Sequence, residues 1–399
     1  MGGAHSELSI RKAYLPGAFV MKRISIVALI SLACILPAAW GEQPPCKHPT
    51  PWGEFHRHNM QRSNPCESVL NTRTARNLSL KWSYNTGTAY PVSSSPAAAD
   101  GVVYVGSTDR NVYALNLRTA AFLWSYATRG IVHSSPAVSN GVVYLGSDDG
   151  DVYALNASTG AKLWNYTTGS YVDSPPTVSD GVVYVGSSDH NAYALDAKTG
   201  TELWRYSTGD AVLSSPAVSN GVVYVGSYDH NVYALDAQTG AQLWSYTTDN
   251  ALTSSPAVAN GVLYVASRNG VLFALEASTG TLLWTYGSVG DIVESSPAVA
   301  NGVVYFGSDN GIVYAVDASH GAKMWSHTTV SSVTSSPAVA DGVVYVGSWD
   351  HSVYALDAKT GAELWSYTTG NIVESSPAVS NGVVYVGSDD GSLYAFGLK

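Results

Sequence analysis

The sequence predicts an all-β protein, an eight-bladed β-propeller built from four-stranded antiparallel blades. One segment occurs eight times, and its Ser-Pro step recurs every 40 residues with a single spacing of 41. A fixed period of this size is typical of repeated units that bury their faces against one another. Each copy also contains four short apolar runs with turn residues between them. The repeated prolines are Pro96, Pro136, Pro176, Pro216, Pro256, Pro297, Pro337 and Pro377.

The copy around Pro216 shows the four runs most clearly. We name the predicted strands A to D in chain order, and they cover Ser214 to Val218, Val222 to Ser227, Val232 to Asp236 and Gln242 to Thr247. Val, Tyr, Leu, Trp and Thr fill these runs, and such side chains suit a pleated surface. The pairs Asn220-Gly221, Asp229-His230 and Thr239-Gly240 predict tight turns between them. Strand B is apolar throughout, so both faces of the sheet should be covered. Eight such sheets with short links indicate a propeller.

The way the ring closes follows from a count of strands. Strands A, B and C occur eight times, but the Leu-Trp strand D follows only seven of these sets. The eighth Trp, Trp82, precedes the first strand A, so a strand near residues 78–86 should complete the last blade and remove two exposed edges. The repeated tryptophans are Trp82, Trp124, Trp164, Trp204, Trp244, Trp284, Trp325 and Trp365.

Composition limits the classes of partner. The formal net charge is −10, and 13% of the residues are charged, about half of the roughly 25% usual in globular proteins. A nucleic-acid partner would need a basic face, so we expect none. Anionic membranes are disfavoured for the same reason.

The first 41 residues contain a signal-like segment from Met21 to Gly41. Lys22 and Arg23 precede an apolar run from Ile24 to Leu36, which is too short for a comfortable membrane span. We therefore expect residues 1–41 to be a leader whose true start is Met21, and the mature chain to lack a transmembrane span. The protein would be exported to the periplasm, the cell surface or the medium. A lipoprotein anchored through Cys34 is the alternative.

Residues 42–77 show no strand pattern and should form an N-terminal arm leading into the propeller of residues 78–399. Two cysteines remain after cleavage, Cys46 and Cys66. An even count in an exported chain predicts a disulfide that clasps the arm. Two free thiols are the alternative.

The turn between strands C and D carries a motif that resembles a known family. Ala194-Leu-Asp196-Ala-Lys-Thr-Gly200-Thr-Glu-Leu-Trp204 is similar to the tryptophan-docking motif of pyrroloquinoline-quinone-type propellers. The resemblance covers residues 78–399 and implies that each Trp packs against the neighbouring blade. Three copies depart from the motif, with Ala120 in place of Gly, Glu276 in place of Asp and His320 before its Gly.

The resemblance implies two classes of relative. Quinoprotein dehydrogenases hold pyrroloquinoline quinone over the channel, in many cases between a Trp and a disulfide of adjacent cysteines, with calcium nearby. No two cysteines are adjacent here, and every connection is short. We therefore expect no enzyme and no cofactor, but a monomeric, exported scaffold that binds a protein or another cell-envelope component. A quinoprotein-like oxidoreductase using pyrroloquinoline quinone and calcium is the alternative.

Two positions vary between repeats and should meet on one rim of the channel, because the D-to-A and B-to-C connections lie on one face of a blade. The residue before Ser-Ser-Pro includes His133, Asp173, Glu294 and Glu374, and the first B-to-C turn residue includes Tyr228, Arg268 and Trp349. Aromatic and Arg side chains are enriched in binding hot spots. We expect a partner at Tyr228, Arg268, Trp349 and His133. Carboxylates suit calcium, so Asp173, Glu294 and Glu374 are candidate cation ligands, with solvated acids as the alternative.

Overall fold

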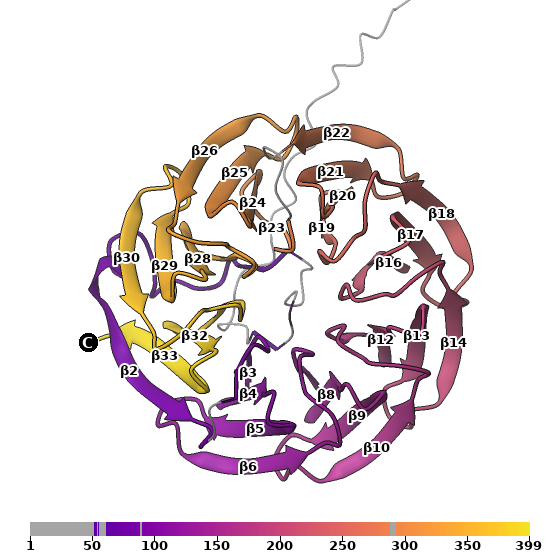
Figure 1. Cartoon of the computed structure of the whole chain (residues 1–399), viewed down its shortest axis with the longest axis horizontal. Coiled ribbons are helices and arrows are strands. Elements are labelled where there is room, and N and C mark those ends of the chain that lie inside the picture. The colour runs from indigo at the N-terminus through magenta and orange to yellow at the C-terminus, as the bar shows by residue number, and fades with distance from the viewer. Residues whose placement is uncertain (1–51, 54, 56–60, 88–89, 288–292) are drawn as a thin grey trace, which may run out of the picture. The chain divides into compact units, whose positions relative to one another are not determined.

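Eight β-sheets form a closed ring (Figure 1). The computed structural model describes residues 52–53, 55, 61–87, 90–287 and 293–399. All of these belong to one compact unit, Pro45–Lys399. The leader and Met21 lie outside the described residues. The eight-bladed, all-β prediction is confirmed.

Each blade is an antiparallel meander whose strands run from the channel outward, as predicted. The innermost strands A are β3 (Ala97–Ala99), β7 (Ala137–Ser139), β11 (Thr177–Ser179), β15 (Ala217–Ser219), β19 (Ala257–Ala259), β23 (Ala298–Ala300), β27 (Ala338–Ala340) and β31 (Ala378–Ser380). Strands B are β4 (Val102–Gly106), β8 (Val142–Gly146), β12 (Val182–Gly186), β16 (Val222–Gly226), β20 (Val262–Ala266), β24 (Val303–Ser308), β28 (Val343–Gly347) and β32 (Val383–Ser388).

The two outer strands complete each blade. Strands C are β5 (Asn111–Asn116), β9 (Asp151–Asn156), β13 (Asn191–Asp196), β17 (Asn231–Asp236), β21 (Val271–Glu276), β25 (Ile312–Asp317), β29 (Ser352–Asp357) and β33 (Ser392–Leu398). Strands D are β6 (Phe122–Ala127), β10 (Lys162–Thr167), β14 (Glu202–Ser207), β18 (Gln242–Thr247), β22 (Leu282–Gly287), β26 (Lys323–Thr328), β30 (Glu363–Thr368) and, from the N-terminal side, β2 (Leu78–Asn85).

Strand A is shorter than its sequence pattern predicts. In the fourth blade it begins at Ala217 and not at Ser214, because Pro216 has no N–H to donate to a ladder. The serines before it bond around the channel instead. In the first blade the Ser94 hydroxyl donates to the Ser134 carbonyl, 3.2 Å away. The Ser-Ser-Pro step therefore connects neighbouring blades.

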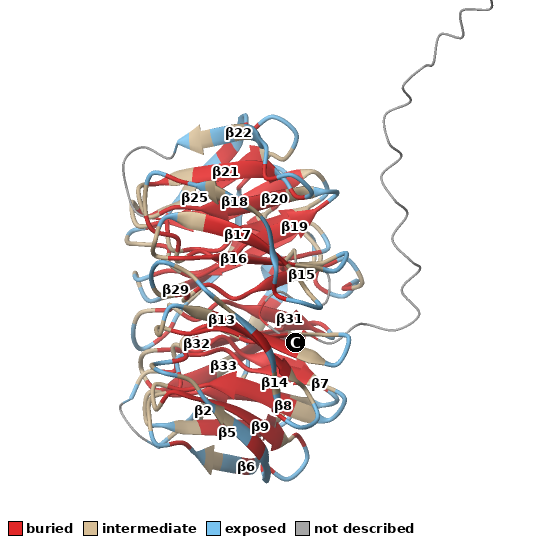
Figure 2. Cartoon of the chain, turned by 90° about the vertical axis from the view of Figure 1, so that its right-hand side faces the viewer, coloured by how far each residue is buried: buried red, intermediate tan, exposed pale blue. Residues whose placement is uncertain are grey.

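Burial follows the order of the strands (Figure 2). Strands B and C are buried on both faces, as the apolar run of strand B predicts. Strands D alternate between exposed and covered residues, since their outer face meets solvent. Asn220 and Gly221 both have positive φ, at 50° and 75°, which is the geometry of the predicted A-to-B turn.

The tryptophans of strands D join neighbouring blades, as the resemblance implies. Trp124 donates from Nε1 to the Ala157 carbonyl of the next blade at 2.9 Å, and Tyr104 donates to the same oxygen at 3.1 Å. The Trp124 ring lies against Gly160, where an added Cβ would approach the ring to 2.6 Å. Glycine at this place of the motif is therefore a packing requirement.

The N-terminal strand closes the ring. Strand β2 pairs antiparallel with β33, with Leu78 opposite Leu398 and Asn85 opposite Ser392. The predicted closure is confirmed, and the last blade is built from both ends of the chain.

The prediction that the arm carries no strand is wrong. β1 (Ser63–Asn64) pairs in parallel with β27, and the 3₁₀ helix η1 (Ala75–Asn77) lies beside β30. The arm is ordered because its backbone groups bond to strands A, at Ala98, Val138, Val299 and Val339. Cys66 is disulfide-bonded. It is the only cysteine among the described residues, and Cys46 lies outside them.

Candidate functional site

One end of the channel is lined by the residues that differ between blades, and we call this set the rim. It consists of the residue before each Ser-Ser-Pro step and the first residue of each B-to-C turn. The two sets meet as predicted, since Trp349 Nε1 donates to Thr334 Oγ1 at 2.9 Å. Trp349 is 39% exposed.

Three predicted rim residues form one chain of contacts across three blades. Arg268 donates to the Tyr228 hydroxyl at 3.0 Å, and its guanidinium carbon lies 5.8 Å from the centre of that ring. The second terminal nitrogen of Arg268, Nη2, forms an ion pair with Glu294 at 3.1 Å. Arg268 is thereby held in one position on the rim. A partner that contacts it would therefore restrict this side chain little further, and the loss of side-chain entropy on binding would be modest.

His133 lies on another part of the rim. Its Nδ1 is 3.2 Å from the hydroxyl of Ser93, the equivalent residue of the preceding blade. The structure thus places Tyr228, Arg268, Trp349 and His133 on one face, in three separate contact groups.

Carboxyl groups of the rim have raised pKa values because they are partly buried beside one another. Burial, and then the neighbouring Asp173, raise the pKa of Asp148 to about 7. Burial, Asp389 and Glu294 raise the pKa of Glu374 to about 7. Burial and Asp390 raise the pKa of Asp389 to about 6. These groups change charge near neutral pH.

The three predicted cation ligands do not form a metal site. Within the described ranges, no three His, Cys, Asp or Glu side chains come together in a way that could hold a metal ion. Asp173 interacts with Asp148, and Glu294 is paired with Arg268. Asp173, Glu294 and Glu374 therefore engage neighbours on the rim.

The repeated Asp of the B-to-C turn is structural. Asp229 accepts from the Asn231 amide at 2.9 Å and from the Tyr233 hydroxyl at 2.7 Å. It also accepts from the Gly209 amide at 2.6 Å. Such bonds hold the turn in shape.

Beyond the rim, the arm lies against the inner strands of the channel, and Arg62 is its central residue. This side chain is fully buried and donates to the carbonyls of Pro337, Phe55, Ser336 and Pro377 at 2.6–3.3 Å. Its guanidinium carbon lies 4.3 Å from the centre of the Phe55 ring. Burial lowers the pKa of Arg62 to about 9.

Sequence reasoning missed Arg62, and it missed Asp148 and Asp389 as partners of the predicted acids. The two aspartates occupy the variable B-to-C position, so the alignment of repeats contained the signal for them. Arg62 lies outside every repeat, and nothing in its local sequence marks it as buried.

The class of protein is defined by these features: an eight-bladed propeller tied by docked tryptophans and closed by its N-terminal strand. Two family models, each matching just under half of the chain, support a place in the pyrroloquinoline-quinone-like β-propeller repeat family. A model described as outer membrane protein assembly factor BamB matches residues 70–173 and 309–399. A model described as the β-propeller of the β-alanine-activating enzyme matches residues 142–339.

Solved structures of two kinds share the fold. A europium-containing methanol dehydrogenase is 18% identical, with a TM-score of 0.79 over 88% of this chain and 99% of that one. BamB from Moraxella catarrhalis is 22% identical, with a TM-score of 0.71 over 80% and 100%. A quinohemoprotein alcohol dehydrogenase from Pseudomonas putida is 20% identical, with a TM-score of 0.77 over 88% and 81%. These likenesses show the fold alone.

A short match reaches a curated protein. A segment of 57 residues is 33% identical to a quinohemoprotein alcohol dehydrogenase from Comamonas testosteroni. The segment covers 14% of this chain and 8% of that enzyme.

The prediction that the chain is not an enzyme is contradicted by these comparisons. Two of the similar structures and the curated match are dehydrogenases, and one matching family model describes an enzyme's propeller. Short connections therefore do not separate this chain from enzymes. Because no three His, Cys, Asp or Glu side chains of the described part could together hold a metal ion, we derive no chemical step through quinone or metal.

Among the described residues, no helix has the length and apolar character needed to cross a membrane.

Proposed function

We propose that the chain is an exported propeller that binds a protein partner of the cell envelope through the rim. The observation that carries this proposal is that two sets of variable positions, before the Ser-Ser-Pro steps and at the start of the B-to-C turns, meet at one end of a ring of near-identical blades. There Trp349 is exposed and Arg268 is held by Tyr228 and Glu294. A preorganised Arg and exposed aromatic rings are the groups that dominate binding energies at interfaces.

The rim also offers apolar contact area. Tyr90, Tyr171 and Val330 are exposed on D-to-A connections, and Val330 is 90% exposed. Exposed apolar groups on the face that carries the rim add contact area for a partner. Carboxylates outnumber basic groups on the rim, so we expect the partner's contact surface to carry Lys or Arg. The similarity to an outer membrane protein assembly factor and the signal-like segment support a location in the envelope.

Site-specific photo-crosslinking in the native envelope tests the proposal. A crosslinking residue in place of Trp349 should give a discrete product, whereas one in place of Leu243 on the outer strand β18 should not. Arg268→Ala should reduce the yield from position 349, and so should high salt, which screens exposed charges. Equal products from both positions, or none from position 349, would refute a partner on the rim.

A second candidate is a quinoprotein-like oxidoreductase, which the dehydrogenase matches favour. In that case Trp349 and Glu374 would be the residues nearest the bound quinone, which supplies the hydride-accepting group. Titration with pyrroloquinoline quinone, with and without calcium, should then raise the melting temperature saturably. No change at high micromolar quinone would exclude this candidate.

A further inference from the structure

At the seam between the last and first blades the Trp82 and Tyr385 ring centres lie 5.9 Å apart, against 5.8–5.9 Å for the equivalent pairs at the other seams, and the hydrogen bonds are at the long end of the range. Trp82 Nε1 lies 3.3 Å from the Leu117 carbonyl, whereas the six bonds from Trp124 to Trp325 are 2.9–3.2 Å. The Tyr385 hydroxyl is likewise 3.3 Å from the same oxygen, against 3.0–3.2 Å at the equivalent seams.

This seam also carries one departure from the docking motif. At the other seams the Trp ring lies on a glycine, where a Cβ would come within 2.5–2.7 Å of the ring. Ala120 occupies this place beside Trp82 and adopts the same turn conformation, with φ at 57°.

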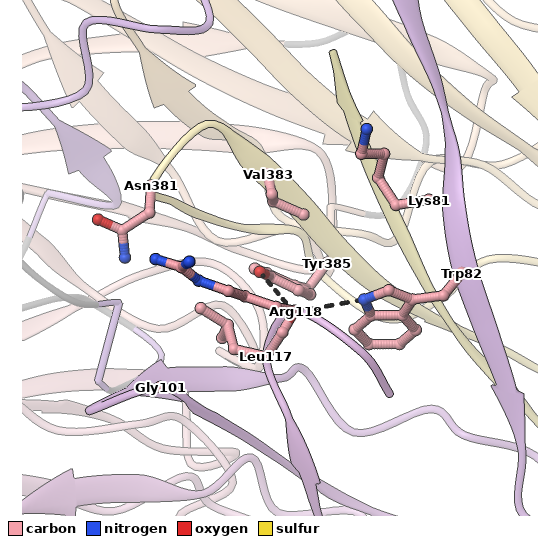
Figure 3. Close-up of a pocket in the computed structure, with 8 residues that line it drawn as sticks. All are labelled: Lys81, Trp82, Gly101, Leu117, Arg118, Asn381, Val383 and Tyr385. Atoms are coloured by element: carbon pink, nitrogen blue, oxygen red, sulfur yellow. Dashed lines mark hydrogen bonds between the residues drawn. The ribbon is translucent and has the colours of Figure 1, made fainter. Parts of the chain in front are cut away.

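A pocket of about 480 Å³ lies at this seam. The bonds from Trp82 and Tyr385 to the Leu117 carbonyl converge beside Arg118 in Figure 3. Apolar and aromatic groups form its walls, and no carboxylate from the described part of the chain lines it. The lining residues are Lys81, Trp82, Gly101, Leu117, Arg118, Asn381, Val383 and Tyr385.

The polar groups of the pocket are cationic or neutral. The Arg118 guanidinium extends toward Asn381 in Figure 3, and within the described residues it forms no ion pair or hydrogen bond. It lies close enough to Tyr385 to act on that hydroxyl electrostatically. Lys81 points to the other side and donates to the Leu398 carbonyl. At the seam of Trp164, Leu163 and Lys198 occupy the two equivalent positions, so a pair of cationic side chains is particular to the seam of Trp82.

We propose that this pocket binds a small carboxylic acid with an apolar, ring-sized body. The ring would lie against Trp82, Leu117 and Val383. The carboxylate would accept from the fork of Arg118, whose planar donors match two carboxylate oxygens. This site is separate from the rim, and the proposal does not depend on the function proposed there.

Titration with 4-fluorophenylacetate, followed by ¹⁹F NMR, tests the site in the mature full-length protein. We expect a dissociation constant of about 1 mM for a ligand of this size. Arg118→Ser should weaken binding by about tenfold, since a charge-assisted hydrogen-bonded pair is lost. The matched control Lys198→Ser, at the equivalent place of another seam, should leave binding unchanged. Both substitutions introduce Ser, which other blades already carry there, so the fold should be retained.

Two further arms make the result decisive. The neutral analogue 4-fluorophenylacetamide should bind at least tenfold more weakly than the acid. A tripeptide ending in a free phenylalanine would show whether a chain terminus is a better source of the same carboxylate.

The proposal is overturned by any of three results. These are equal binding of acid and amide, unchanged binding to Arg118→Ser, and no binding at about twenty times the expected dissociation constant.

Discussion

Arg62 Nε donates to the carbonyl of Pro337 at 2.9 Å, across 275 residues of chain. The same guanidinium bonds to carbonyls of the seventh and eighth blades and to Phe55 within the arm. The N-terminal arm is thereby fixed to the inner strands by a buried charge that forms no ion pair within the described residues.

Arg62→Met should therefore destabilise the propeller. The variant leaves four buried carbonyl bonds unmade, and we expect the free energy of unfolding to fall by about 3 kcal/mol. Urea unfolding followed by Trp fluorescence measures this. The control Arg73→Met, at an exposed position on the same arm, should change it by less than about 0.5 kcal/mol. If the two variants lowered the free energy of unfolding equally, the buried hydrogen bonds of Arg62 would contribute nothing to stability.

The repeated part of the fold could be predicted because the same pattern of residue types recurs in eight copies. The Asn220-Gly221 turn and the Trp204 docking position recur at a fixed spacing, so chance matches average out. Strand D follows only seven of the eight sets of strands A to C, so counting alone identified the segment around Trp82 as the strand that closes the ring.

The arm and the pairings on the rim could not be predicted in this way. Arg62 is held by backbone carbonyls, which every residue carries, so no sequence pattern marks its partners. The ion pair of Arg268 with Glu294 joins different blades, and its existence depends on distances that spacing along the chain does not give. Ala120 was visible as a departure, but nothing in the sequence marked the pocket at its seam.

Tyr345 and Tyr305 occupy equivalent places but should respond oppositely to loss of the hydroxyl. Tyr305 donates to the Ala358 carbonyl at 3.0 Å. The Tyr345 hydroxyl is buried and has no hydrogen-bond partner within the described residues, because the last blade has no C-to-D turn to supply a carbonyl. Tyr305→Phe should lower the free energy of unfolding by about 1 kcal/mol, and Tyr345→Phe should raise it by a similar amount. Thermal or urea unfolding of both variants checks the signs. Destabilisation of the same size by both would contradict this account.

Removal of residues 78–86 should open the ring. The deletion exposes the edge of β33 and removes Trp82 from the seam with the first blade. We expect a lower melting temperature and partial recovery when a synthetic peptide of residues 78–86 is added in trans. A scrambled peptide is the control. An unchanged melting temperature after the deletion would be incompatible with closure by β2.

The raised pKa of Asp148 makes the rim a source of pH-dependent stability. The folded state holds this proton up to about pH 7, whereas the ordinary pKa is 3.8. The folded state therefore binds more protons than the unfolded state between these values, and stability falls as the pH rises through this window. Asp148→Asn removes the ionisable group, so it should raise the melting temperature at about pH 8 and change it little at about pH 4. Asp249→Asn, at an exposed position, serves as the control. A gain for Asp148→Asn that is the same at both pH values would mean that the contact with Asp173, and not the charge, sets the stability of this part of the rim.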